Sequence, residues 1–443
     1  MIFFCIIGSI LLALLPNLLW TIGWLGCKIA GFRLPYKHFG LCSLALVAVF
    51  LLAMVYGYHI GRWNIKSTKI EYSHKDIPKA FDGFRIVHIS DLHLSTFDDS
   101  KERFRGFIDE INKHNPDLVC FTGDLVTLGK SEAEPYTDIL KAIKSKHGVL
   151  SVLGNHDFMI YGFKQNFDRE TAVEELARYQ EEVLGWNLLR NESTVIESED
   201  GSKITFLGVD NANFSNQGFH TIHRGDLNKA MKGTDGFRVL LSHDPSHWSA
   251  EVIPDTDIPL TLSGHTHSAQ IKIFGWTPAK WSFKEIAGRY DNDDQTLYIN
   301  VGLGCTAPIR LGVNPEVTLI TLKSNGITYQ QLHESMTEVA ASEQTIYSYE
   351  NTYIAEVDGK IVGAICAYDG ADYQRLKQPV VDILGPDSGF AELKETEAGE
   401  FYFDFVGVLE EYRGRGIASK LFTAQIAHAR SLGHPMKHMV INL

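Results

Sequence analysis

Paired cysteines are lacking in this chain of 443 residues. The six cysteines are scattered and form no Cys-x-x-Cys motif, so neither a disulfide framework nor a cysteine zinc site follows. Positive charge is also scarce, because 41 Lys and Arg face 54 Asp and Glu, a formal net charge of −13. This balance argues against a protein that coats itself with nucleic acid, and no nucleic-acid partner is expected. Disorder is disfavoured, since apolar residues make up 44% of the chain and charged residues only 21%.

Charged side chains are absent from two long apolar runs near the N-terminus. Residues 1–27 and 38–61 contain no Asp, Glu, Lys or Arg, and each run is long enough to cross a hydrocarbon core of about 30 Å. A cleaved signal peptide is the alternative for the first run, but that run lacks a basic leader and a second span follows it. We therefore expect residues 1–62 to anchor the chain in a lipid bilayer, the bacterial cytoplasmic membrane, through two transmembrane helices. The side that holds the rest of the chain stays open, because cations flank the second run at both ends.

Short apolar strands alternate with helices after residue 66. The expected strands cover residues 86–90, 118–122, 149–153, 203–209, 239–242, 260–263, 296–300 and 317–322. Amphipathic spacing predicts helices at 101–114 and 168–184. The pattern indicates a layered α/β domain with two stacked sheets.

A possible metal ligand directly follows five of these strands. The side chains in question are Asp91, His93, Asp124, Asn155, His156, Asp157, His243, His265 and His267. Each alone has an ordinary explanation as a turn former or a solvated side chain, but the carboxyl ends of strands in an open α/β sheet line one crevice. The joint pattern therefore predicts one site. Imidazole together with carboxylate suits Mn, Fe or Zn, and two such ions would attract a phosphate and support phosphoester hydrolysis.

The order of these motifs, Asp-x-His, Gly-Asp, Gly-Asn-His-Asp, His and Gly-His-x-His, resembles the calcineurin-like metallophosphoesterase superfamily. Segments 89–93 and 300–310 are similar to its membrane-associated bacterial branch, which includes phosphodiesterases that split UDP-diacylglucosamine. The resemblance covers residues 66–333 and implies a two-sheet αββα sandwich. Whether the substrate is a phosphomonoester or a phosphodiester, and lipid-linked or nucleotide-linked, stays open.

The resemblance also implies a role for each residue of the site. One metal ion would be held by Asp91, His93 and His267. The second would be held by Asn155, His243 and His265, with Asp124 bridging the two ions. His156 would face the phosphate as a proton donor or charge stabiliser, and Asp157 would orient the His156 ring.

Several residues outside the motifs invite interpretation. His88, inside a strand, is expected to be an ordinary core residue, and His247 is expected at the surface. Two segments rich in aromatic residues, 158–167 and 274–283, are either ordinary surface packing or walls that face a lipid-linked substrate.

The pattern changes after residue 333, and we place a domain boundary there. A polar stretch precedes a hairpin in which Asp358-Gly359 joins strands at 352–357 and 361–368. A strand at 400–408 then leads to a glycine-rich turn and a helix that runs to about residue 431.

The hairpin, strand and glycine-rich turn resemble the GNAT acetyltransferases, in which such a turn at a helix N-terminus holds acetyl-CoA. The resemblance implies that the cofactor contacts Val408, Arg413, Gly414, Gly416 and Ala418. A further strand is expected at 438–442, but the family pattern is incomplete at both ends. We therefore expect residues 334–443 to form a partial α+β domain that folds weakly by itself, after a phosphoesterase domain at 63–333. An acetyl-CoA-dependent N-acyltransferase is the alternative function.

Overall fold

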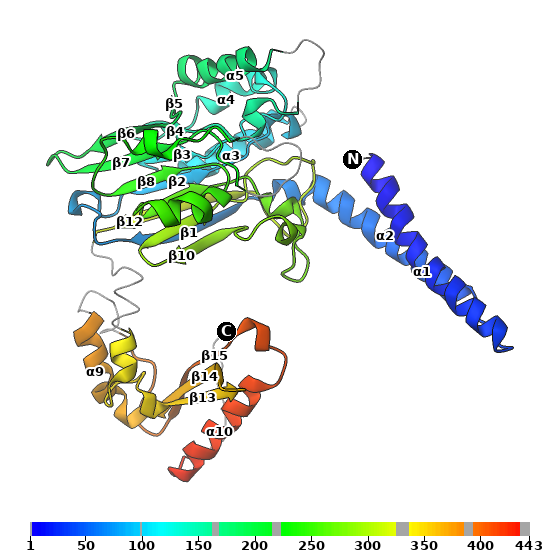
Figure 1. Ribbon diagram of the computed structural model, residues 1–443, viewed down its shortest axis with the longest axis vertical. Helices are drawn as coiled ribbons and strands as arrows, with labels where there is room; N and C mark the ends of the chain where they lie inside the picture. The colour runs from blue at the N-terminus through cyan, green and yellow to red at the C-terminus, as the bar shows by residue number, and fades with distance from the viewer. Residues whose placement is uncertain are drawn as a thin grey trace. The chain divides into compact units, whose positions relative to one another are not determined.

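The computed structural model describes residues 2–97, 100–161, 168–214, 223–324, 336–384 and 393–434. It divides into two compact units, residues 1–327 and 328–443, which are described separately below (Figure 1). The strand expected at 438–442 lies outside the described residues.

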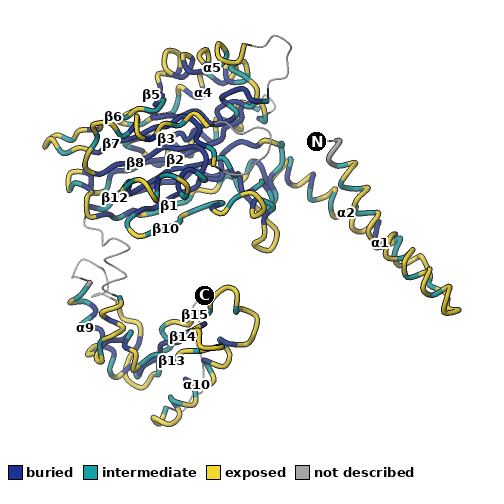
Figure 2. Tube along the Cα trace, viewed as in Figure 1, coloured by how far each residue is buried: buried dark blue, intermediate teal, exposed yellow. Residues whose placement is uncertain are grey.

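The first unit begins with two long apolar helices, α1 (Ile2–Ile29) and α2 (Lys37–His59), which are the two helices expected from the sequence. Both are long and apolar enough to cross a membrane. Figure 2 shows that they are mostly exposed, in contrast to the buried sheets that follow. Asn17 of α1 donates a hydrogen bond to Ser43 of α2 (3.2 Å) and accepts one from Tyr36 (2.7 Å). Polar contacts of this kind hold helices together inside membranes.

Two six-stranded sheets follow the helices. The first has the order β1-β12-β2-β3-β4-β5. Its strands are β1 (Lys66–Ser73), β12 (Glu316–Lys323), β2 (Arg85–Ile89), β3 (Leu118–Phe121), β4 (Val149–Ser151) and β5 (Asn187–Leu188). The second has the order β10-β11-β9-β8-β7-β6. Its strands are β10 (Gly288–Asn292), β11 (Gln295–Ile299), β9 (Leu260–Ser263), β8 (Arg238–Leu241), β7 (Lys203–Gly208) and β6 (Glu192–Glu197).

The two sheets pack face to face. Successive side chains of a strand point to opposite faces, so a strand of either sheet contributes to two different cores. In β2, Ile86 joins a core that also contains Phe206 and Leu262 of the second sheet. Its neighbours Val87 and Ile89 point the other way, into the core beneath the outer helices. The central strands are therefore apolar on both faces, as strands covered on both sides must be.

Helices cover the outer face of each sheet (Figure 1). On the first sheet these are α3 (Lys101–Lys113), α4 (Thr137–Leu140) and α5 (Arg169–Arg178). On the second they are the short α6 (Leu227–Met231) and α7 (Ile253–Asp255). The two-sheet αββα sandwich is thereby confirmed. The helix expected at 168–184 ends its α-helical part at Arg178 and continues as a π-helical turn, Tyr179–Val183.

The second unit contains a three-stranded antiparallel sheet with the order β13-β14-β15. Its strands are β13 (Thr352–Val357), β14 (Lys360–Asp369) and β15 (Phe401–Val408). The expected hairpin is confirmed, since Asp358 and Gly359 turn with φ of 52° and 79°, the left-handed pattern of a two-residue hairpin loop. Helices α9 (Tyr373–Leu384) and α10 (Ile417–Ser431) are among those that accompany this sheet. Ile417 and Leu421 of α10 pack on Val362 and Ile365 of β14.

Candidate metal centre

The proposed ligands lie together where five strands end. Asp91 and His93 follow β2, Asp124 follows β3, and Asn155 follows β4. His243 follows β8, and His265 and His267 follow β9. Both sheets therefore contribute to the site, and all these side chains are buried or nearly so.

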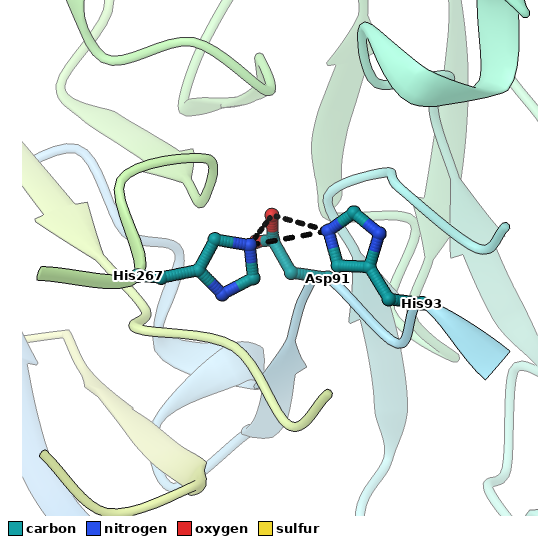
Figure 3. Close-up of side chains that lie close together, drawn as sticks. All are labelled: Asp91, His93 and His267. Carbon is teal, nitrogen blue, oxygen red and sulfur yellow. Dashed lines mark hydrogen bonds and ion pairs between the residues drawn. The ribbon is translucent and has the colours of Figure 1, made fainter. Parts of the chain in front are cut away.

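Asp91, His93 and His267 form the first cluster (Figure 3). His267 Nε2 lies 3.2 Å from Asp91 Oδ1 and 3.1 Å from His93 Nε2. His93 Nε2 is 3.9 Å from the same carboxylate oxygen. The three ligand atoms thus face one point, as Figure 3 shows.

Asp124, His243 and His265 form the second cluster, and Asn155 adjoins it. His243 Nε2 lies 3.2 Å from Asp124 Oδ2, 3.1 Å from Asn155 Oδ1 and 3.2 Å from His265 Nδ1. The other ring nitrogen of His243 donates to the carbonyl of Thr122 (2.6 Å). That hydrogen bond leaves Nε2 as the nitrogen available to a ligand.

Asp124 lies between the two clusters. Its Oδ2 is 3.5 Å from His93 Nε2 of the first cluster and 3.2 Å from His243 Nε2 of the second. Asp91 Oδ1 and Asp124 Oδ2 are both buried and accept no hydrogen bond from the described residues. Buried carboxylate oxygens need a partner, and imidazole with carboxylate is a donor set for Mn, Fe or Zn. The residues present therefore fit two divalent cations.

The carboxylates of Asp91 and Asp124 both have a lowered pKa, which suits them to bind divalent cations. Burial alone would raise the pKa of Asp91, but His267, His243 and His93 hold it well below its usual range. Burial is likewise outweighed at Asp124, where His243, His156 and His93 lower the pKa. Both carboxylates are thus charged acceptors.

His156 is held by the chain at two points. Its backbone N–H donates to Asp124 Oδ1 (2.8 Å), and its ring Nδ1 donates to the carbonyl of Thr127 (3.2 Å). The ring stacks on Tyr161, with centroids 4.3 Å apart. The ring's remaining nitrogen, Nε2, is left for substrate or metal.

Asp157 has a different role from the one that the family resemblance implied, which was to orient the His156 ring. Its carboxylate accepts hydrogen bonds from the backbone N–H groups of Asp124 (2.8 Å), Gly154 (3.0 Å) and Val126 (3.2 Å). The reason is local, because residues 156–158 form a 3-10 turn in which Asp157 is buried. Burial, together with the neighbouring charge of Asp124, raises the pKa of Asp157 to about 8. Asp157 thus fixes the loops that present Asp124 and Asn155, and Thr127 orients the His156 ring.

Many of the proposed ligands have a left-handed backbone. The φ angles are 51° at Asp91, 42° at His93, 59° at Asp124, 71° at His265 and 47° at His267. Such angles are uncommon for residues other than glycine and concentrate at functional sites. A glycine is needed beside them at Gly264, where an added Cβ would collide with Ser90 and with the Asp91 carboxylate.

Sequence reasoning missed several supporting residues. Asp244 Oδ2 lies 3.4 Å from His265 Nε2. Arg310, which is fully buried, donates to the carbonyls of Val301 (2.8 Å) and Gly302 (2.9 Å) and comes within 3.5 Å of His267 Nδ1. Arg310 had two signals in the sequence: it ends segment 300–310, which carries the family resemblance, and it is the lone charge within residues 295–315.

Two histidines outside the motifs, His88 and His247, are both fully buried. His88 is fully buried in β2, as expected. The prediction that His247 lies at the surface is wrong, because it is buried between Ser242 (2.8 Å) and Glu251 (2.9 Å). His247 directly precedes the helical turn Trp248–Val252, whose residues Trp248 and Val252 are also buried.

The residues expected to hold acetyl-CoA gather at the junction of β15 and α10. Residues 413–416 are exposed, and Gly414 and Gly416 have φ of 75° and 72°. Arg413 Nε donates to the carbonyl of Val408 (3.2 Å). Gly416 caps α10, and Ala418 lies in its first turn.

Comparison with known families gives two matches. The model of the calcineurin-like phosphoesterase family matches residues 84–269, and the model of the acetyltransferase (GNAT) family matches residues 324–440.

Three relatives illustrate the range of similar proteins. The uncharacterized metallophosphoesterase YkuE of Bacillus subtilis is 31% identical over 61% of this chain and 90% of its own length. A transmembrane protein with metallophosphoesterase domain of Danio rerio is 29% identical over 63% of this chain and 62% of its own. The UDP-2,3-diacylglucosamine pyrophosphatase LpxG of Chlamydia muridarum is 24% identical over 62% of this chain and 94% of its own.

Proposed function

The chain belongs to the calcineurin-like metallophosphoesterase family and is a metal-dependent phosphoester hydrolase, and we propose that its centre holds two divalent ions. The observation that supports a dinuclear centre is the pair of buried carboxylate oxygens, Asp91 Oδ1 and Asp124 Oδ2. Neither accepts a hydrogen bond from a described residue, and imidazole nitrogens surround both.

The residues divide into two ligand sets around Asp124. Asp91, His93 and His267 would hold one ion. Asn155, His243 and His265 would hold the other, and Asp124 would contact both. Two such ions would lower the pKa of a bound water and stabilise the negative charge that develops on the phosphate.

His156 is the chain's own contribution to proton transfer. Because Thr127 fixes the proton on Nδ1, Nε2 can meet the phosphate or the leaving oxygen. A protonated ring there would donate a proton to the leaving oxygen, or stabilise the negative charge of the phosphate through its Nε2–H. The Tyr161 ring restricts the imidazole to this orientation.

Membrane attachment and substrate class belong to the same proposal. Helices α1 and α2 would anchor residues 63–333 at a bilayer, since both are of spanning length and one relative is named a transmembrane protein. The substrate would be a phosphomonoester or phosphodiester that is lipid-linked or nucleotide-linked. A relative named for a pyrophosphatase of UDP-2,3-diacylglucosamine supports this range.

The test uses the full chain in detergent, stripped with chelator and reloaded with Mn²⁺. Hydrolysis of bis-p-nitrophenyl phosphate and of p-nitrophenyl phosphate is compared for the unmodified protein, Asp124→Asn and Asp109→Asn. Asp109 is an exposed carboxylate on α3 and serves as the control. We expect metal-dependent turnover that Asp124→Asn removes and Asp109→Asn keeps. Metal bound without turnover of either ester would contradict the proposal.

A second candidate function concerns residues 334–443. The GNAT family match and the two left-handed glycines at the start of α10 favour acetyl-CoA binding and N-acyl transfer. Exposed N–H groups at a helix N-terminus bind pyrophosphate well. Isothermal titration of the full chain with acetyl-CoA tests this candidate, with Gly416→Val as the variant that should lose binding. Absence of saturable acetyl-CoA binding in the unmodified chain would rule out this second candidate function.

A further inference from the structure

A loop next to the metal centre displays large apolar side chains to solvent. We call residues 271–284 the aromatic loop. Within it, Phe274 is fully exposed, Trp281 is 79% exposed, Ile273 is 52% exposed and Trp276 is 42% exposed. Single exposed apolar residues are ordinary, but a contiguous group of them marks an interaction surface.

The backbone at the tip of the aromatic loop is strained. Ile273 and Trp276 pair as an antiparallel bridge, so Phe274 and Gly275 form a two-residue hairpin turn with φ of 50° and 82°. A left-handed conformation is unfavourable for a bulky residue such as phenylalanine. Packing within the described chain does not explain the strain, because Phe274 is fully exposed. Strain that no internal contact offsets points to a role outside the molecule.

The aromatic loop is also basic. It contains Lys272, Lys280 and Lys284, all exposed, and no acidic residue, in a chain whose net charge is −13, although Lys284 pairs with Glu285 directly after the loop (3.4 Å). Aromatic rings beside lysines are typical of the lipid–water interface. Lysines close to an anionic membrane surface are attracted to its headgroups.

The aromatic loop is joined to the end of α2 through residues 310–312. Lys272 N–H donates to the carbonyl of Leu311 (2.8 Å), and Ile271 pairs with Leu311 as a parallel bridge. Arg310 N–H donates in turn to the carbonyl of Gly57 in the last turns of α2 (3.2 Å). The loop is therefore attached at the point where the second apolar helix ends.

The other side of the aromatic loop contacts the metal centre. The loop begins four residues after His267, and the ring of Phe283 packs edge-on against the ring of His265, with centroids 5.4 Å apart. Thr277 fixes the loop by donating to the carbonyl of Ser268 (2.5 Å). One connected set of contacts thus runs from α2 through the loop to His265 and to Ser268, the residue after His267.

We propose that the aromatic loop inserts into the bilayer that α2 crosses, and that it holds the metal centre at the depth of the lipid headgroups. The partner is the lipid–water interface of an anionic membrane. Phe274 at the hairpin tip enters the acyl region, Trp276 and Trp281 lie at the interface, and the lysines contact anionic headgroups. This inference rests on the proposed membrane anchoring but does not depend on catalysis for its test.

Tryptophan fluorescence of the full chain in nanodiscs tests the docking. The nanodiscs contain phosphatidylcholine and phosphatidylglycerol, with or without brominated acyl chains. The emission of the unmodified chain minus that of Trp276→Phe/Trp281→Phe reports the loop tryptophans alone. We expect brominated chains to remove about half of this difference signal, because interfacial rings lie beside the acyl region. Aqueous iodide should change it little.

The control is the corresponding difference for Trp186→Phe, because Trp186 is buried in the protein core and should respond to neither quencher. Quenching of the loop signal by iodide would overturn the proposal, since the rings would then lie in water. Protection from both quenchers would also overturn it, since a protein surface would then cover the loop.

Each variant is assayed in parallel on bis-p-nitrophenyl phosphate, a soluble ester that needs no bilayer. An unchanged rate in Trp276→Phe/Trp281→Phe shows that the metal centre has formed. Normal hydrolysis with an iodide-accessible loop would refute docking alone. A bilayer-protected loop without hydrolysis in the unmodified chain would refute the phosphoesterase function alone.

Discussion

At the scale of single residues, His156 is set apart from the other imidazoles of the centre by its partners. Its Nδ1 donates to the carbonyl of Thr127, as that of His243 does to the carbonyl of Thr122, but its ring is stacked on Tyr161. The ring nitrogens of His243 and His267, by contrast, point at carboxylate oxygens of Asp124 and Asp91. A ring placed in this way can act on substrate while others hold metal.

We predict that His156→Ala retains both metal ions but lowers kcat by ~10²–10⁴-fold, the usual contribution of a general acid. Metal content by mass spectrometry and turnover of bis-p-nitrophenyl phosphate are measured on the same sample. His147→Ala, which removes an exposed imidazole, is the matched control. Loss of one equivalent of metal would instead make His156 a ligand, and unchanged turnover would remove it from the mechanism.

His88 makes stability depend on pH. Burial lowers its pKa to about 3, although the charge of Asp91 opposes this, and its neighbours are Thr122 and the ring of Tyr298. The folded protein therefore keeps His88 neutral while the unfolded chain binds a proton below pH ~6.5. The resulting stability is complete above that pH and is lost as the pH falls from about 6.5 towards 3.

The expected cost from His88 is about 1.4 kcal/mol in the free energy of unfolding per pH unit within this window. Urea unfolding at pH 7, 6 and 5 measures it in the unmodified chain and in His88→Gln. The other titrating groups are common to both proteins, so the difference in slope isolates His88. Parallel slopes would show that His88 is protonated equally in the folded and unfolded states.

At the scale of elements, the junction between α2 and residues 310–312 is tightly packed. Arg310 N–H donates to Gly57, and a Cβ added at Gly61 would collide with the carbonyl of Arg310. The side chain of Arg310 donates to the carbonyls of Val301 and Gly302 and lies near Nδ1 of His267. A substitution at the end of α2 should therefore affect metal binding through His267.

We predict that Gly61→Ala destabilises the protein by about 1–3 kcal/mol, the usual cost of overpacking, and weakens metal binding by about tenfold through His267. Gly26→Ala is the control, because nothing lies within 4 Å of a Cβ placed there. Thermal unfolding and Mn²⁺ titration of both variants in detergent measure the two effects. Equal behaviour of the variants would show that the junction is not coupled to the centre.

The sequence predicted the central strands better than the edge strands and better than the residues that position the ligands. β2, β3 and β9 are almost entirely buried and precede distinctive ligand motifs, so pattern and spacing located them. β1 and β10 were missed because their half-exposed residues mix polar and apolar types without a clear period. Asp157, Arg310 and His247 took unexpected partners because those contacts join segments far apart in the chain or follow a turn that the sequence does not specify.

At the scale of the whole molecule, the metal centre links the two sheets. Ligands follow β2, β3 and β4 of the first sheet and β8 and β9 of the second. Removal of the ions would leave Asp91 and Asp124 buried without hydrogen bonds on one oxygen each. Binding of the proposed ions would therefore help to hold the two sheets together.

We predict that chelation lowers the thermal midpoint of the full chain and that Mn²⁺ restores it in a concentration-dependent way. An excess of about 100 Kd would stabilise the folded state by about 2.7 kcal/mol for each ion bound. Differential scanning calorimetry of the chelated and reloaded protein measures the shift, with Asp124→Asn as the variant that should respond least. A midpoint that is independent of metal would mean that the centre is formed without ions.

The polar contacts of Asn17 with Ser43 and Tyr36 hold α1 and α2 as one antiparallel pair. A chain that crosses a bilayer and then returns ends where it began. The start of α1, the phosphoesterase unit and the GNAT-like unit would accordingly share one compartment, whichever it is. A reporter fused before α1 would then locate both units, and the supply of acetyl-CoA in that compartment would determine whether the proposed cofactor can reach the second unit.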